Sequence, residues 1–238
     1  MGRYINVGNQ FQINSAKKIF FPASTQSATQ PWVVPAGVTC ATFEMWGGGG
    51  AGSPSCCCTC YFGEPGGGGG YAMKTIPVTP GASYTVVVGQ GGCGNMCWFN
   101  GNACGCCGWP SYVTGAGLSN LCANGGQGGA WCNSSSSYSC GGCAYGGDVN
   151  ITGMDGNMTS MCYFYRNGMQ AGGAAPFGGG WTVSPRHVGS VSSGLNCGSA
   201  GSYPGGGSPA KTGFVPGWCD CQSGCTGGGA DGLVVITI

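Results

Sequence analysis

Residues 38–52 read VTCATFEMWGGGGAG, and this stretch decides the fold. Its first part alternates between two faces, with Thr39, Ala41, Phe43 and Met45 on one side and Val38, Cys40, Thr42 and Glu44 on the other. A period of two is typical of a half-buried β-strand. Isolated glycine disfavours strands and helices because it loses the most backbone entropy on folding. Clustered glycines, such as those of residues 125–129 and 178–180, can instead adopt the polyproline-II conformation, which rises about 3.1 Å per residue.

Further strands are predicted on both sides of this stretch. Residues 71–78 (YAMKTIPV) and 83–88 (SYTVVV) flank the turn TPGA, and this arrangement predicts a β-hairpin. Residues 232–238 (GLVVITI) are apolar on both faces, as in a central, covered strand. No segment shows helical periodicity. We therefore expect an all-β protein with an antiparallel β-sandwich core, whose strands lie at about 32–88 and 231–238.

Residues 89–230 are predicted as a long glycine-rich, polyproline-II-like insertion in that core. The chain has 54 glycines, roughly three times the usual share of about 7%. Glycine segments pack closely and can satisfy their backbone groups by lateral hydrogen bonds. Aromatic residues make up 11% of the chain, which argues against a long disordered loop. We expect a bundle of extended glycine segments with aromatic side chains in the gaps; plain loop is the alternative.

Composition excludes several classes of protein. Charged residues make up only 5% of the chain and the net charge is +1, so no basic face is expected and nucleic-acid binding is not predicted. No run of 18 apolar residues predicts a transmembrane helix. The start of the chain lacks the apolar core of a signal peptide. Residues 1–31 are polar and predict a separate N-terminal attachment arm, and residues 32–238 form the glycine-rich β-domain.

Four ordered blocks of sequence resemble the glycine-rich domain of bacteriophage tail-fibre and related virion proteins. They are WVVPAGVTCATFEMWGGGGAG (32–52), GGGGGYAMKTIPVTPGASYTVVVGQGG (66–92), GGDVNITG (146–153) and GGGADGLVVITI (227–238). The resemblance covers about residues 31–238. It implies a β-sandwich core with a glycine-rich insertion, often at the distal end of a fibre that contacts the bacterial surface, and it carries over no catalytic residues. This chain is richer in cysteine than family members usually are.

The resemblance further implies a structural virion protein of a tailed phage, made in the infected bacterial cytoplasm and then extracellular. As a tail-fibre or tail-tip component it would contact a glycan or surface protein of the host envelope. Residues 1–31 would bind other virion proteins, and a homotrimer follows by analogy with fibres. Two alternatives are open: a capsid or tail decoration or adaptor protein without a receptor role, and an extracellular ice- or surface-binding protein.

Nineteen cysteines are a density typical of disulfide scaffolds. Clustered thiols could also bind zinc or an iron–sulfur cluster, although structural zinc sites usually combine two C-x-x-C knuckles and the chain has one. Disulfides between clusters, or buried thiols, are favoured over metal, and connectivity does not follow from spacing. The candidate thiols are Cys56, Cys57, Cys58, Cys60, Cys104, Cys106, Cys107, Cys140, Cys143, Cys219, Cys221 and Cys225.

No catalytic constellation is visible. The six carboxylates are scattered singly and the one histidine is His187, so no pair suggests acid–base catalysis. Residues 89–94 match G-x-G-x-x-G after a strand, but no helix pattern follows to receive a pyrophosphate. We therefore predict no enzyme activity and no cofactor.

Aromatic patches in the glycine-rich half are the candidates for recognition. Tyr, Trp and Arg dominate recognition surfaces, and aromatic faces stack on sugars. For most of these residues, packing against glycine backbone is the alternative. The candidate receptor-binding residues are Trp98, Phe99, Tyr163, Phe164, Tyr165 and Arg166.

Overall fold

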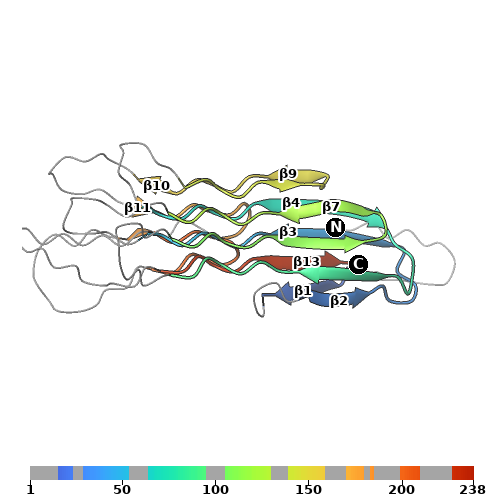
Figure 1. Ribbon diagram of the computed structural model, residues 1–238. Coiled ribbons are helices and arrows are strands. Elements are labelled where there is room, and N and C mark those ends of the chain that lie inside the picture. Colours follow the sequence, from blue (N-terminus) through green and yellow to red (C-terminus); the bar gives the residue numbers. More distant parts are fainter. Residues whose placement is uncertain are drawn as a thin grey trace, which may run out of the picture.

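A computed structural model describes residues 16–23, 29–53, 64–94, 105–129, 139–158, 170–179, 183–184, 199–209 and 227–238. Every regular element within these ranges is a β-strand. No helix in the described ranges is long and apolar enough to cross a membrane. Figure 1 shows an elongated molecule, with the longer strands at one end and extended segments running away from them toward the other.

The strands are short and separated by glycine-rich segments. Their bounds are β1 Lys18–Pro22, β2 Thr29–Val33, β3 Cys40–Trp46, β4 Tyr71–Pro77, β5 Ser83–Val87, β6 Ser111–Gly115, β7 Leu118–Ala123, β8 Ala144–Tyr145, β9 Val149–Ile151, β10 Asn157–Met158, β11 Gln170–Ala171, β12 Val183–Ser184 and β13 Leu233–Thr237.

Two five-stranded antiparallel sheets form the larger part of the fold. Sheet A has the order β1-β13-β3-β4-β9, and sheet B has the order β2-β5-β6-β7-β8. The sheets stack face to face, with β3 and β4 of sheet A against β6 and β7 of sheet B (Figure 1). A third, three-stranded sheet of β10, β11 and β12 lies toward the far end of the molecule. The predicted all-β class with antiparallel sheets is confirmed.

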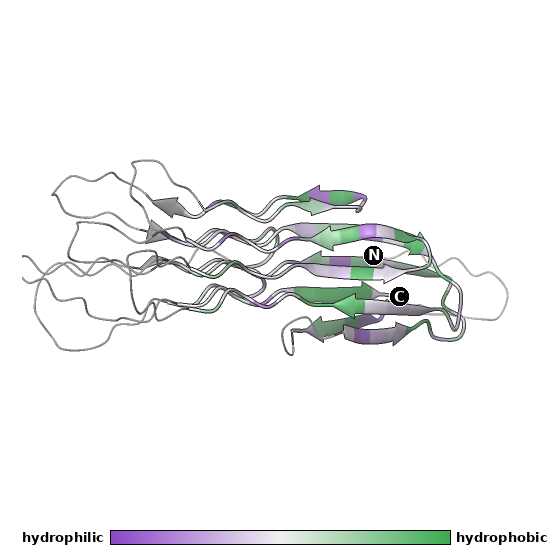
Figure 2. Ribbon diagram, in the orientation of Figure 1, coloured by the Kyte–Doolittle hydropathy of each residue, from purple (hydrophilic) through white to green (hydrophobic). Residues whose placement is uncertain are grey.

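The sandwich core follows from the period-two pattern. On β3, Ala41, Phe43 and Met45 are buried, as predicted, whereas the residues between them face outward. Phe43 meets Trp32 edge-to-face with ring centroids 5.7 Å apart, and Tyr84 lies 5.4 Å from Phe43. Figure 2 shows the contrast between the apolar strands and the pale glycine segments beyond them. The sandwich therefore has a side-chain core centred on three aromatic rings.

The predicted hairpin of residues 71–78 and 83–88 is wrong. Strand β4 pairs with β3 and β9 in sheet A, whereas β5 pairs with β2 and β6 in sheet B. The Pro-Gly turn between them closes with a hydrogen bond from Ala82 N to Thr79 O, but it carries the chain from one sheet to the other. After this crossover Ile76 of sheet A and Tyr84 of sheet B both face the common core.

The C-terminal strand confirms its prediction as a central, covered element. β13 lies between β1 and β3, and Val234 and Ile236 are fully buried. β1 and most of β2 lie within residues 1–31, so the described part of the expected attachment arm consists of paired edge strands of the two sheets. β6 to β9 lie within residues 89–230, and they complete the same sheets. Residues 1–15 lie outside the described ranges.

Candidate functional site

Beyond the sandwich, extended segments pack side by side into what we call the glycine bundle (Figure 1). Each segment continues from, or leads into, a neighbouring strand or turn. The segments are residues 47–53, 64–70, 89–94, 105–110, 124–129, 139–143, 152–156, 172–175, 201–208 and 227–232.

Hydrogen bonds along residues 47–53 repeat every three residues. The N–H groups of Gly47, Gly50 and Ser53 all donate to carbonyls of segment 64–70, at distances of 2.8–3.0 Å. A repeat of three residues per turn is that of the polyproline-II helix. The glycine run after β3 thus continues as an extended helix of the kind that was expected of the glycine clusters in residues 89–230.

The intervening residues of this segment bond to different neighbours. Gly48 and Ala51 donate to segment 105–110, and Gly49 donates to segment 227–232. Because the backbone rotates by a third of a turn per residue, successive amides face three separate segments. Every backbone donor of the run from 47 to 51 is thereby satisfied without a side chain, as buried backbone requires.

Segment 64–70 occupies a similar central position. Its amides donate to segments 201–208, 124–129 and 152–156, and its carbonyls accept from segments 47–53, 139–143 and 172–175. Six neighbours around one extended helix describe a hexagonal bundle. The core of this half of the molecule is therefore backbone, not side chain.

The bundle segments lie so close together that many of their positions have room only for glycine. A Cβ added at Gly50 would lie within 3.0 Å of the backbone of Gln127 and Gly128. One added at Gly126 would meet the carbonyls of Gly67 and Gly68 at similar range. These neighbours are backbone atoms that already carry lateral hydrogen bonds, so they have little freedom to retreat.

Polar side chains complete the bonding where backbone partners end. Ser111 Oγ accepts from Gly89 N and donates to the carbonyl of Trp46, at the junction of bundle and sandwich. Ser208 Oγ accepts from Gly52 N at 2.7 Å. Such buried hydroxyls satisfy groups that would otherwise be costly to bury.

The carboxylates hold structural positions. Asp155 accepts from Gly141 N and Asp231 accepts from Gly91 N, each at 2.8 Å. On the outer face of sheet A, Tyr71 donates to Glu44 at 3.1 Å. Burial, and then the nearby Glu44 charge, raise the pKa of the Tyr71 hydroxyl. None of these contacts pairs two carboxylates for acid–base chemistry.

The G-x-G-x-x-G match at residues 89–94 is a bundle segment. Its amides at Gly89, Gly91 and Gly92 donate to Ser111, Asp231 and Gly49. A phosphate-binding loop needs such amides to be available to the ligand. These three donors are occupied, so this segment does not form a dinucleotide-binding loop.

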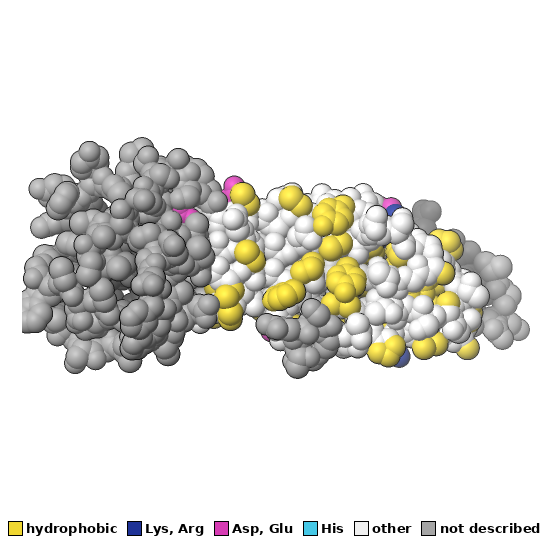
Figure 3. Space-filling view, in the orientation of Figure 1, with side chains coloured by type: hydrophobic (Ala, Val, Ile, Leu, Met, Phe, Trp, Pro, Cys, Tyr) yellow, Lys and Arg dark blue, Asp and Glu magenta, His cyan; other side chains and the backbone are white. Residues whose placement is uncertain are grey.

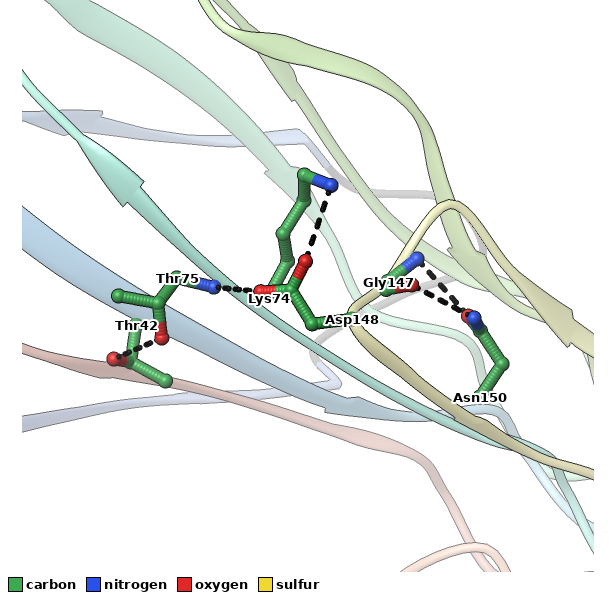
Figure 4. Close-up of polar contacts among 6 residues, drawn as sticks. All are labelled: Thr42, Lys74, Thr75, Gly147, Asp148 and Asn150. Carbon is green, nitrogen blue, oxygen red and sulfur yellow. Dashed lines mark hydrogen bonds and ion pairs between the residues drawn. The ribbon is translucent and has the colours of Figure 1, made fainter.

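The GGDVNITG motif holds the three-residue connection between β8 and β9, residues 146–148, and β9 itself (Figure 4). Gly147 N donates to Asn150 Oδ1 at 3.0 Å, and Asn150 Nδ2 donates back to Gly147 O at 2.8 Å. Asp148 accepts from Thr75 N at 3.0 Å and lies 3.5 Å from Lys74 Nζ. Asp148 comes just before β9 begins, and its carboxylate accepts from the Thr75 amide of β4 beyond the last pair of the two strands, Met73 and Val149.

We expect Asp148→Asn to make stability less sensitive to acid. The Thr75 N–H, and to a smaller extent the Lys74 charge, lower the pKa of the Asp148 carboxyl. A lowered folded-state pKa stabilises the fold above the unfolded pKa, and this contribution is lost as the pH falls through the folded value. The window therefore lies below about pH 4. Thermal midpoints measured from pH 7 to pH 2 should fall less steeply for the variant, and parallel profiles would contradict this role.

The chain leaves and re-enters the bundle at one end. It leaves after residues 53, 94, 129, 158, 184 and 209 and returns at 64, 105, 139, 170, 199 and 227, at the end remote from the long strands (Figure 1). Six connections between described segments thus start and finish at the same end of a bonded bundle.

Most predicted site residues belong to these connections and lie outside the described ranges. They are Trp98, Phe99, Tyr163, Phe164, Tyr165, Arg166, Cys56, Cys57, Cys58, Cys60, Cys104, Cys219, Cys221 and Cys225, and His187 also lies outside. The grouping of the receptor-binding candidates therefore stays a prediction.

Cysteines of the described ranges lie on the sheets and in the bundle. They are Cys40, Cys93, Cys106, Cys107, Cys122, Cys140 and Cys143. Cys107 Sγ accepts from Gly128 N at 3.4 Å, and burial raises the pKa of the Cys122 thiol. Among the residues that the structure describes, no three His, Cys, Asp or Glu side chains gather as metal ligands would.

An apolar outer face of sheet A was not predicted as a site. The strand register aligns Trp46, Tyr71 and Ile151 in one outward row, and Trp46 Nε1 donates to Pro176 O at 2.6 Å. Phe177, 78% exposed, stacks edge-on against Tyr71 with centroids 5.1 Å apart. The signal in the sequence was the C-terminal strand, which is apolar on both faces: Val234 and Ile236 face the sandwich core, and Val235 packs in a second buried cluster on the outer face. Figure 3 shows hydrophobic side chains gathered on the middle of one face of the molecule.

Comparison with known proteins agrees with this architecture. A family model described as a glycine-rich domain matches residues 24–238, a range that includes every bundle segment and all strands except β1. A search of the curated proteins finds no match.

Proposed function

The chain belongs to the glycine-rich domain family, and from this premise we propose that it is a structural virion protein of a tailed bacteriophage. In this proposal it is a tail-fibre or tail-tip component that contacts the host cell surface. The sequence blocks that resemble phage glycine-rich domains motivate the assignment to a virion.

One observation carries the proposal: six connections between described segments start and finish at the same end of the glycine bundle. A bundle whose backbone donors are bonded to neighbouring segments is a rigid support. Segments that a rigid support presents together lose little freedom on binding, which favours recognition. Two of the connections carry the aromatic candidates, Trp98 and Phe99 in one and residues 163–166 in the other. Recognition would then use shape and stacking, with no chemical step.

Attachment to the virion is proposed at the opposite end, through residues 1–31. Within that stretch Phe20 is 62% exposed on edge strand β1, next to the apolar outer face of sheet A. Trp46 and Tyr71 of that face are buried, so its exposed aromatic side chains are Phe20 and Phe177, the latter 78% exposed. Exposed apolar side chains that lie together mark protein–protein contacts. The same two side chains are the observation that favours the alternative, a capsid or tail decoration or adaptor protein without a receptor role.

Binding of the labelled full chain to intact bacteria and to their extracted envelopes tests the proposal. We expect saturable binding that Trp98→Ala and Tyr165→Ala weaken at least about tenfold, because aromatic anchors dominate such interfaces. Trp109→Ala and Tyr145→Ala are the matched controls, since these side chains are 45% and 44% exposed near the sandwich. The controls should bind as the parent does.

Absence of binding across a panel of Gram-negative and Gram-positive cells, from a folded protein, would reject the receptor role. If that protein still associated with isolated phage tails or capsids, and Phe20→Ser abolished the association, the decoration or adaptor role would be supported instead.

A further inference from the structure

We propose that Cys93 and Cys106 form a reversible disulfide that locks two segments of the glycine bundle together at its far end. Their Sγ atoms lie 2.6 Å apart. A disulfide bond measures about 2.05 Å, so a small side-chain rotation closes the gap. Cys93 lies outside every cysteine cluster, and spacing alone does not point to it.

Backbone hydrogen bonds hold both cysteines in place. Gly92, just before Cys93, donates to Gly49 O at 2.8 Å and accepts from Gly229 N at 2.9 Å. Cys106 accepts at its carbonyl from Ala51 N at 2.9 Å. The backbones of Gly92 and Cys106 approach so closely that a Cβ on Gly92 would lie within 3.0 Å of Ala51 N and Cys106 C. The two thiols are therefore positioned by the fold before any bond forms, which favours this pairing over others.

Both thiols are accessible to a soluble oxidant. Cys93 is exposed, and Cys106 and Cys122 are both partly exposed, but burial raises the pKa of the Cys122 thiol. Thiolate character and access set the rate of thiol–disulfide exchange. Oxidation at this pair is therefore expected to be faster than at Cys122.

A small-molecule disulfide such as oxidised glutathione supplies the oxidising equivalents. The Cys93 thiolate attacks one sulfur of the reagent, forms a mixed disulfide and releases one glutathione thiolate. The Cys106 thiolate then attacks the Cys93 sulfur, forms the Cys93–Cys106 bond and releases the second thiolate. Two protein thiols are oxidised, one reagent disulfide is reduced, and the two protein protons pass to the released thiolates.

The bond would cross-link the points where the chain leaves the bundle after Gly94 and returns at Gly105. The two cysteines are 13 positions apart. A ring of this size restricts the unfolded chain enough to raise the thermal midpoint by about 5–10 °C in a domain of this length. The bundle end would thus be more rigid in an oxidising medium than in a reducing cytosol.

The test compares the full chain after reduction and after exposure to oxidised glutathione, with EDTA present so that no metal protects the thiols. We expect a non-reduced digest to contain a Cys93–Cys106 linked peptide pair, and the oxidised protein to unfold at higher temperature. Cys93→Ser should remove the pair and most of the shift, while Cys40→Ser, at an exposed cysteine on β3, should retain both.

Alkylation of Cys93 and Cys106 by iodoacetamide after oxidation would overturn the proposal, as would linkage of Cys93 to another cysteine. Equal midpoints of the oxidised and reduced parent would overturn the stabilising role. No cells or phage particles enter this experiment, so its outcome is independent of the proposed host contact.

Discussion

Gly50→Ala is expected to lower the free energy of unfolding by more than about 3 kcal/mol, and so to remove much of the stability of a typical domain. A methyl group at Gly50 would meet the backbone of Gln127 and Gly128 within 3.0 Å. Relief requires a neighbouring segment to move, and that segment is bonded to others through its own amides and carbonyls. One methyl group would therefore disturb several hydrogen bonds together.

A graded series separates this packing effect from the general effect of losing a glycine. Gly37 has a φ of +82° and open space around its Cβ position, so Gly37→Ala should cost only about 1–2 kcal/mol of backbone strain. At Gly228 the nearest atom, Gly92 O, would lie 3.1 Å away, and an intermediate loss is expected. Guanidinium unfolding curves for the three variants measure the order.

Equal stability of Gly50→Ala and Gly37→Ala would contradict the close-packed bundle. If Gly50→Ala gives no soluble protein, the comparison of Gly228→Ala with Gly37→Ala still tests the relation between space and stability.

The sequence predicted the sandwich core well because burial on strands has a period. Phe43 and Met45 alternate with outward residues, and β13 is apolar on both faces, so their positions followed from pattern alone. The same pattern does not say which sheet a strand joins. Alternation on β4 and β5 fits a hairpin and a crossover equally, since both bury Ile76 and Tyr84. Only the pairing with β9 and β2 distinguishes them.

The sequence predicted that glycine segments would form a bundle, but not which segment lies beside which. A run such as residues 66–70 consists of identical residues, so nothing in it marks which glycine faces which neighbour. The three-residue repeat appears only in the hydrogen bonds, because the backbone and not a side chain supplies the specificity. The Cys93 and Cys106 contact was missed for a related reason: it is set by two segments lying side by side, which spacing does not encode.

For the candidate site, the sequence predicted which residue types take part but not where they lie in the fold. Aromatic and cysteine residues were singled out by type, and most belong to connections between bundle segments. Asp148, by contrast, was noted as a single carboxylate within a motif. Its structural role follows from the start of β9 beside Thr75.

Two kinds of interior thus meet within one chain, and they should respond differently to mutation. The sandwich is stabilised by burial of apolar side chains, so removing atoms there is harmful. The bundle is stabilised by backbone hydrogen bonds at close approach, so adding atoms there is harmful. At the junction, Ser111 bonds both to Gly89 of the bundle and to Trp46 of β3.

Phe43→Ala is therefore expected to destabilise the protein by about 3–5 kcal/mol, the usual range for removing a buried phenylalanine. Phe43 is fully buried and contacts the rings of Trp32 and Tyr84. Its loss leaves a cavity between the two sheets. Guanidinium unfolding followed by tryptophan fluorescence, to which Trp32 beside the site contributes, measures the loss.

Phe20→Ala is the matched control, because the same side chain on edge strand β1 is 62% exposed. Its effect should stay within about 0.5 kcal/mol. Since β3 continues directly into segment 47–53, damage at Phe43 should also loosen the bundle. Amide hydrogen exchange at Gly47 to Gly50 should then accelerate in Phe43→Ala and not in Phe20→Ala. Unchanged exchange there, despite a destabilised sandwich, would mean that the two interiors are stable independently and that the continuity of β3 with the bundle does not couple them.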